Sequence, residues 1–117
     1  AKATLNWLVE NAADPGYASI ARLRLSALLI ESKNYDEALK LVATGVADDF
    51  LALSADRRGD IYVLQGRRPE AIAEYGKAYS AFDDQSEYRR LVVVKLNALG
   101  VNPQADIKTA AIPGGVK

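Results

Sequence analysis

The sequence predicts an all-α fold in which about six helices pack as antiparallel pairs. Apolar residues recur three and four positions apart along most of the 117 residues, which is the helical period. Glycine, proline and aspartate residues interrupt this pattern about every dozen positions, and such short connections favour antiparallel neighbours. A spacing of small and large residues also recurs after 33 positions, so we expect the helix pairs to stack as a solenoid.

Three helices are predicted in the first half of the sequence. The first covers about residues 3–13 and ends at the turn formed by residues 14–16, because its proline cannot continue a helix. The second, over about residues 17–32, has a broad apolar face and charged residues on the other side. The third begins near Asn34, whose side chain we expect to cap the helix, and ends at Gly45.

Three further helices are predicted in the second half. The fourth covers about residues 50–64 and ends before Gly66, which suits a helix end with a positive φ angle. Pro69 fits the first turn of the fifth helix, where the missing N–H has no helical partner to lose. The sixth covers about residues 86–99. Residues 101–117 contain proline, adjacent glycines and few large apolar residues, so we expect a loosely ordered tail.

The 33-residue repeat joins these helices in pairs. One set of positions holds Gly59, Tyr62, Ala71, Tyr75, Ala78 and Asp83, and the set 33 residues earlier holds Ser26, Leu29, Ala38, Val42, Gly45 and Phe50. Small residues recur where two helices cross closely, so we expect Gly59 to pack against the partner helix. The predicted domain, residues 1–100, contains a half repeat at 1–16, repeats at about 17–49 and 50–83, and a closing helix at 86–99.

The composition excludes several classes of function. Fifteen Lys and Arg balance fifteen Asp and Glu, so the net charge gives no electrostatic basis for binding nucleic acid. The sequence has no His and no Cys, and it therefore lacks most of the usual nucleophiles, metal ligands and neutral-pH bases. We predict no catalytic residues, no cofactor, no metal site and no nucleic-acid partner.

Paired charged residues are interpreted as structural. Asp48-Asp49 and Asp83-Asp84 fall in turns, where aspartate commonly caps the following helix. Arg57-Arg58, Arg67-Arg68 and Arg89-Arg90 fall in or next to helices, where we expect solvated or ion-paired side chains.

The repeat resembles the tetratricopeptide repeat, a helix-turn-helix unit of about 34 residues that stacks into a solenoid. The second copy matches best, through residues 58–62, Ala71 and the step from Tyr75 to Ala78. A narrower resemblance, over about residues 1–100, is to the periplasmic domain of the ancillary SecYEG translocon subunit family. It is carried by residues 21–25, 35–39 and 55–61, together with Gly66, Ala71 and Tyr75.

The family resemblance implies a protein-interaction module on the periplasmic face of the bacterial inner membrane. It implies an N-terminal membrane helix outside this sequence and two partners, the SecYEG channel and a membrane-anchored prolyl-isomerase-like chaperone. The half repeat and the absence of Met predict that the solenoid continues upstream. Two alternatives remain open: a tetratricopeptide scaffold for another partner, and a regulatory fragment of a larger enzyme.

The first helix of each pair is the expected binding surface, because solenoids of this kind bind on their concave side. The candidate partner-binding residues are Ile20, Leu23, Ala27, Ile30, Leu53, Asp56, Asp60 and Val63. The alternative for Ile20 and Leu23 is that the preceding helix covers them. The closing helix is apolar on more than one side, which predicts a homodimer or partner face at Val92, Val93 and Leu96, unless the tail folds over it.

Overall fold

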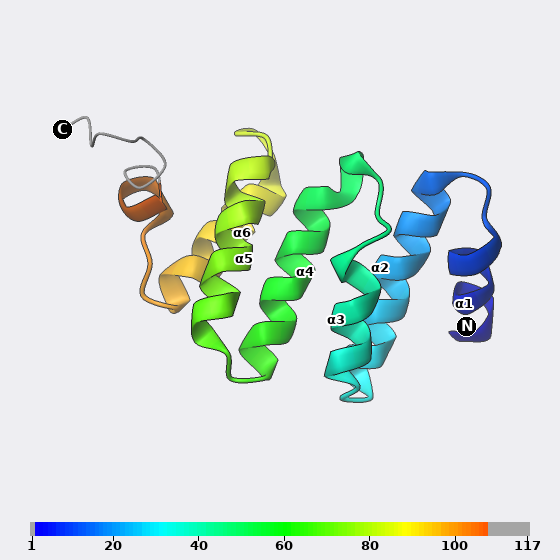
Figure 1. The fold of residues 1–117 in the computed structure, drawn as a ribbon. Coiled ribbons are helices and arrows are strands. Elements are labelled where there is room, and N and C mark those ends of the chain that lie inside the picture. Colours follow the sequence, from blue (N-terminus) through cyan, green and yellow to red (C-terminus); the bar gives the residue numbers. More distant parts are fainter. Residues whose placement is uncertain (1, 108–117) are drawn as a thin grey trace.

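The computed structural model describes residues 2–107, and the helical fold class predicted from the sequence is confirmed (Figure 1). The α-helices in this range are α1 (Lys2–Asn11), α2 (Pro15–Glu31), α3 (Tyr35–Ala43), α4 (Leu51–Leu64), α5 (Arg68–Ala81) and α6 (Glu87–Ala98). A 3-10 turn at Asp48–Phe50 precedes α4, and a π-helical turn at Pro103–Ile107 follows α6.

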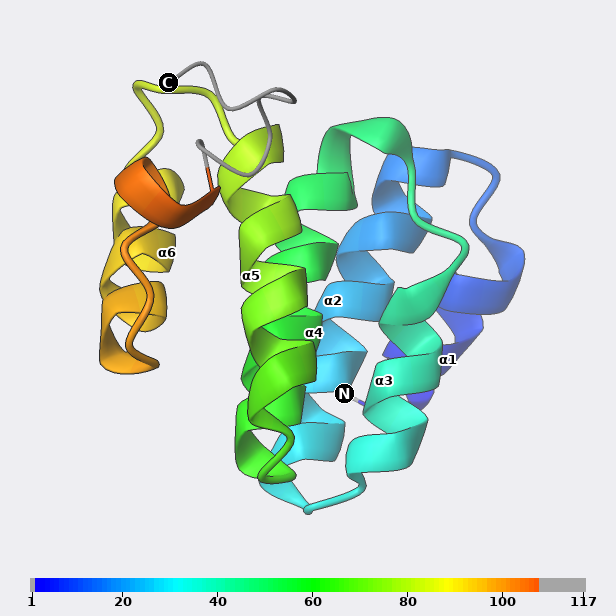
Figure 2. The ribbon, with the colours of Figure 1, turned by 60° about the vertical axis from the view of Figure 1, so that its left-hand side comes forward.

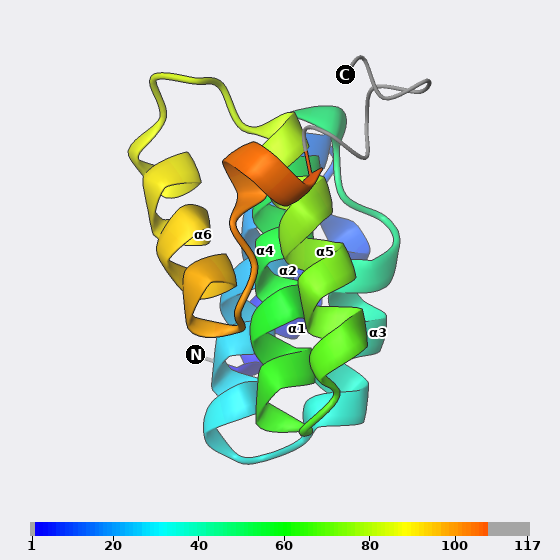
Figure 3. The same cartoon turned by 90° about the vertical axis from the view of Figure 1, so that its left-hand side faces the viewer.

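The helices lie side by side in chain order, each antiparallel to the one before it, in a body that measures 51 × 29 × 23 Å. Helices α2 and α3 form one pair and α4 and α5 form the next, in agreement with the 33-residue spacing. Figures 2 and 3 show that α3 and α5 lie on one side of the body, whereas α2, α4 and α6 form the other layer.

Two clusters of buried side chains hold this arrangement together. One cluster joins α2 and α3 to α4, and it includes Leu29, Val42 and Ile61. The other joins α4, α5 and α6. Helix α4 contributes Ile61 to the first cluster and Ala55 to the second, so it packs on both sides at once.

The helix ends agree with the sequence in most places but not in two. Gly45 and Gly66 have φ angles of 81° and 74°, as expected at helix ends. Pro15, however, begins α2, and the Asp14 side chain caps that helix by accepting a hydrogen bond from the backbone N–H of residue 16, with an N···O distance of 2.7 Å. The predicted side-chain cap at Asn34 is wrong, because its amide donates to the Ser32 hydroxyl instead.

The small residue at Gly59 allows α4 and α5 to approach closely. A Cβ atom at this position would lie 2.5 Å from the ring of Tyr75, which is 3% exposed. The contact confirms the prediction that Gly59 packs against its partner helix. At the equivalent place one repeat earlier, Ser26 is buried between α2 and its neighbours.

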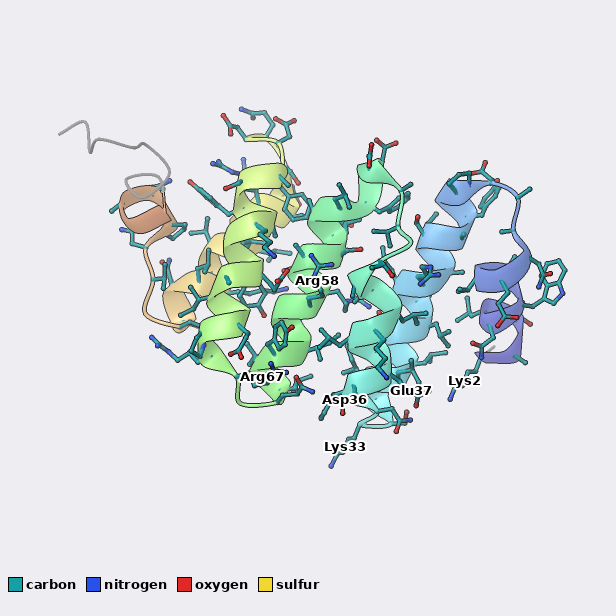
Figure 4. The ribbon with its side chains drawn as sticks, in the orientation of Figure 1. Lys2, Lys33, Asp36, Glu37, Arg58 and Arg67 are labelled. Atoms are coloured by element: carbon teal, nitrogen blue, oxygen red, sulfur yellow. The ribbon has the colours of Figure 1, made fainter. Side chains whose placement is uncertain are left out.

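Arginine side chains bind the open carbonyl ends of neighbouring helices. Arg58 extends from α4 and donates to the carbonyl oxygen of Val42, in the last turn of α3, at 2.7 Å (Figure 4). Arg22 donates to the adjacent carbonyl of Leu41 at 2.8 Å. The last carbonyls of a helix have no partner within it, so these charged donors stabilise the C-terminus of α3 from two sides.

Arg58 also joins α3 to α5. Its Nε lies 2.8 Å from a carboxylate oxygen of Glu74, whose other oxygen pairs with Lys77 at 3.0 Å. Burial opposes the charge on Glu74, but the hydrogen bonds from Arg58 and Lys77 outweigh this effect and lower the pKa of Glu74 from its usual value of about 4.5. The basic residues therefore form the predicted ion pairs and, in addition, hydrogen bonds to the carbonyl oxygens of neighbouring helices.

The α6 residues predicted to contact a dimer partner or another protein are largely buried within the fold. Val92 and Leu96 are completely buried against α5, and Val93 packs beside them. The turn at Pro103–Ile107 contacts both α5 and α6, and Pro103 is fully buried. Part of the segment predicted as a loose tail therefore covers α6, whereas residues 108–117 lie outside the described range.

Gly59→Ala should destabilise the fold, because the added methyl group overlaps the buried Tyr75 ring. We expect the free energy of unfolding to fall by about 1–3 kcal/mol in urea titrations. In a Tyr75→Leu background the smaller side chain leaves room for the methyl group, so the same substitution should cost much less. Equal costs in the two backgrounds would contradict close packing at this contact.

The lowered pKa of Glu74 predicts an acid-dependent loss of stability. A carboxyl group whose pKa is lower in the folded state stabilises the fold above its unfolded pKa and loses this contribution as the pH falls through the folded value. Between pH 7 and pH 3, the free energy of unfolding should therefore fall less in Glu74→Gln than in the unmodified chain. Glu70→Gln, which removes a carboxylate from an exposed pair with Arg67, is the matched control and should follow the unmodified chain.

Candidate functional site

The candidate binding surface is the side of α2, α4 and α6 that faces away from α3 and α5, here named the α2–α4–α6 face. Two of the predicted contact residues are accessible on it: Ala27 is half-buried and Val63 is exposed. Leu23 is 9% exposed and belongs to the core cluster with Ile61, so it is not available to a partner. Ile30 and Leu53 are half-buried and pack partly against the same cluster.

Ile20 lies apart from the other predicted residues, in an apolar hollow between α1 and α2. This hollow has a volume of about 320 Å³, and Leu5 and Leu8 of α1 form part of its wall. Ile20 is 38% exposed. The preceding helix therefore covers Ile20 only in part. Leu23 is buried in a cluster against which residues of both α1 and α4 pack.

Arg57 joins the two neighbouring helices of this face. Its guanidinium donates from α4 to the carbonyl oxygen of Leu23 at 2.7 Å and to the hydroxyl of Ser26 at 2.8 Å. Because both acceptors belong to α2, the two helices keep a constant spacing beneath the candidate surface.

A polar cluster connects α4 to α6. The ammonium group of Lys95 lies 2.9 Å from Asp56 and 3.1 Å from Asp60, the two carboxylates predicted to contact a partner. Tyr75 of α5 donates its hydroxyl hydrogen to Asp60, with an O···O distance of 2.5 Å. Both aspartates are therefore used within the chain, and they hold α6 beside α4.

Burial and the neighbouring charges together shift the pKa values of this cluster. Burial is the largest influence on Asp56 and, with the nearby Asp60 carboxylate, it raises the pKa of Asp56 although Lys95 opposes the shift. Burial also opposes the charge on Lys95, but the hydrogen bond to Asp56 and the proximity of both carboxylates raise the Lys95 pKa. Burial and the bond to Asp60 raise the pKa of Tyr75 strongly, which keeps its hydroxyl protonated as a donor.

The sequence analysis missed the contribution of α6 to the candidate surface. Tyr88, Leu91 and Lys95 lie three and four positions apart on one side of α6, and each stands 35 residues after Leu53, Asp56 or Asp60. Tyr88 and Leu91 are 55% and 56% exposed. Helix α5 is five residues longer than α3, and α6 begins 36 residues after α4 begins, so the 33-residue shift did not reveal this correspondence.

A pocket of about 530 Å³ lies where α4 and α6 begin and α5 ends. Its apolar lining includes Leu51, Leu53, Phe82 and Tyr88, and the last two rings stack at a centroid distance of 5.7 Å. Its polar lining includes Asp48, Asp49 and Asp83. The sequence analysis interpreted these aspartates as helix caps, but neither Asp48 nor Asp49 caps a helix through its side chain.

The arrangement offers an exposed, largely apolar surface. Within residues 2–107, no three or more Asp, Glu, His or Cys side chains are grouped to hold a metal ion. Across the same residues, no helix has both the length and the apolar character needed to span a bilayer. The exposed groups on the α2–α4–α6 face are mainly alkyl and aromatic, and such surfaces mark protein contacts.

Lys95→Met should destabilise the attachment of α6, because it leaves two partly buried carboxylates side by side without a cation. We expect a loss of about 1–2 kcal/mol in the free energy of unfolding, less than for a fully buried pair since these groups retain some contact with solvent. Lys77→Met is the matched control, because the Lys77 side chain is 65% exposed, and it should change stability by less than about 0.5 kcal/mol. Similar losses in the two variants would contradict a structural role for the cluster.

Comparisons with known proteins agree with this architecture. A family model described as a tetratricopeptide repeat-like domain matches residues 1–101. The chain is 34% identical over 99 residues, or 85% of its length, to the ancillary SecYEG translocon subunit of Neisseria gonorrhoeae (strain ATCC 700825 / FA 1090). It spans about half of that relative, 47% of its length. No solved structure matches the chain.

Three observations point to a protein-interaction role. The family model matches most of the chain, the helices form pairs with a 33-residue spacing, and the first helix of each pair has an exposed face. The chain belongs to the tetratricopeptide repeat-like domain family.

Proposed function

We propose that this domain is a non-catalytic interaction module of a subunit that associates with the Sec translocon. The observation that carries the proposal is the 34% identity, over 99 residues, to a protein named as an ancillary SecYEG translocon subunit. The aligned region covers 85% of the chain, and so spans most of the α2–α4–α6 face. In this proposal the parent protein is anchored in the bacterial inner membrane and the domain faces the periplasm.

The chemistry of the α2–α4–α6 face supports a role near unfolded or newly exported chains. Its exposed apolar side chains include Val63, Leu64 and Leu91, which are 43%, 51% and 56% exposed. Its two central carboxylates, Asp56 and Asp60, are paired with Lys95. An extended apolar segment therefore meets hydrocarbon surface there without having to displace a strongly hydrated charge.

The proposed partners are the SecYEG channel and a membrane-anchored prolyl-isomerase-like chaperone. Among the described residues, the exposed large apolar side chains lie on helices other than α3 and α5, so the partners and the exported chains contact the α2–α4–α6 face in this proposal.

Photo-crosslinking of the full gene product in its native host tests the proposal. A photoreactive amino acid replaces Ala27, Val63 or Leu91 on the α2–α4–α6 face, and in matched controls it replaces Lys40 of α3 or Ala73 of α5. All five positions are at least partly exposed. We expect the first three positions to give crosslinks to translocon subunits, to the chaperone or to exported chains in membrane fractions, and the two controls to give markedly fewer.

Two results would contradict the proposal. Equal crosslinking from both faces would exclude the α2–α4–α6 face as the specific contact. Crosslinks confined to proteins outside the export pathway would instead identify the domain as a tetratricopeptide scaffold for another partner.

A further inference from the structure

The pocket between the beginnings of α4 and α6 combines an exposed apolar wall with carboxylates. Leu51 and Tyr88 are 49% and 55% exposed and line the same pocket, from different helices. Tyr88 is held in place by its stacking on Phe82. A volume of about 530 Å³ lies within the range of pockets that bind compact ligands, so it has room for a large side chain together with its neighbours.

The charge in this pocket is negative and largely without a counter-ion. The carboxylates of Asp48 and Asp49 make no hydrogen bond or ion pair with any other residue in the range 2–107. Within the same range, the Asp83 carboxylate accepts only a long bond of 3.4 Å, from the backbone N–H of Gln85. The N-termini of α4 and α6 offset part of this charge, but no basic side chain lines the pocket.

The basic residues of α6 do not neutralise these carboxylates. Arg89 pairs with Asp84 at 3.4 Å, and its guanidinium lies over the Tyr79 ring, 4.1 Å from the centroid. Lys95 is bound to Asp56 and Asp60, farther along α6. The three carboxylates of the pocket therefore remain available to a positive charge from outside the chain.

We propose that this pocket binds a protein segment in which a large apolar side chain is flanked by Lys or Arg. The apolar side chain packs between Leu51 and Tyr88, and the flanking cations pair with Asp48, Asp49 and Asp83. The inference rests on the proposed function and specifies the chemistry of the partner segment. It also fixes the position of a bound chain along the α2–α4–α6 face. The part of that chain with the large apolar side chain and its flanking cations lies at the end of the face where α4 and α6 begin.

Fluorescence anisotropy with the intact chain and a defined peptide tests this inference. The probe is a labelled 15-residue peptide that contains two Lys-Phe-Lys triplets in a Gly-Ser background. We expect saturable binding that weakens when sodium chloride is raised from about 50 to 500 mM, because exposed charge pairs are screened by salt. Peptides with Glu in place of Lys, or Ser in place of Phe, should bind at least about tenfold more weakly.

Variants of the chain locate the binding site. The pair Asp48→Asn and Asp49→Asn should weaken binding about fivefold or more, and Leu51→Ser about tenfold. The matched control is the pair Glu10→Gln and Glu37→Gln, which removes two exposed carboxylates remote from the pocket and should leave binding unchanged. Circular dichroism verifies that each variant retains its helices.

Several outcomes would overturn the inference. Equal binding of the Glu peptide, or equal weakening by the control pair, would show that the pocket is not the site. If the peptide binds only after removal of residues 108–117, the pocket is the site of the chain's own C-terminal end. If the chain forms a dimer that Leu51→Ser abolishes, the pocket is a contact with a second copy. The titration uses no translocon or chaperone, so its failure leaves the crosslinking test of the proposed function unaffected.

Discussion

The close approach of α4 and α5 at Gly59 is the constraint on which the rest of the structure depends. Because this position has no side chain, the ring of Tyr75 lies directly against the backbone of α4. The same ring carries the hydroxyl that binds Asp60, and Asp60 together with Asp56 binds Lys95 of α6. One helix contact in the interior thus determines where α6 is attached.

The remaining helices are joined by the same combination of small residues, apolar clusters and arginines. Helix α4 packs into one cluster through Ile61 and into the other through Ala55, and its two adjacent arginines reach α2, α3 and α5. In a linear stack each helix pair contacts only its neighbours, so these junctions carry the stability of the whole. Apolar packing alone does not fix the position of one helix along another. The directional hydrogen bonds from arginine to helix carbonyls do fix it.

The two proposals follow from how this stack distributes its polar groups. Asp56 and Asp60 are used to attach α6, and the charges of Lys95 and the neighbouring Arg57 balance theirs in the middle of the α2–α4–α6 face. Asp48, Asp49 and Asp83 have no such partner, and they lie beside the exposed Leu51 and Tyr88. The difference between the two groups of acids gives the surface an apolar middle and an acidic end.

Apolar periodicity and small residues at helix crossings are local patterns, so the fold class, the helix pairs and their 33-residue spacing can be predicted from the amino-acid sequence. The contact of Gly59 with its partner helix follows from the same patterns. Which side of each helix is exposed depends instead on what packs against it in three dimensions. Leu23, Val92 and Leu96 are apolar residues on helix surfaces like their exposed neighbours, and they are buried because other helices happen to lie over them. The pocket at Tyr88 likewise forms from two segments that are distant in the sequence, 48–53 and 81–88, and a pattern within one helix carries no information about what packs against it.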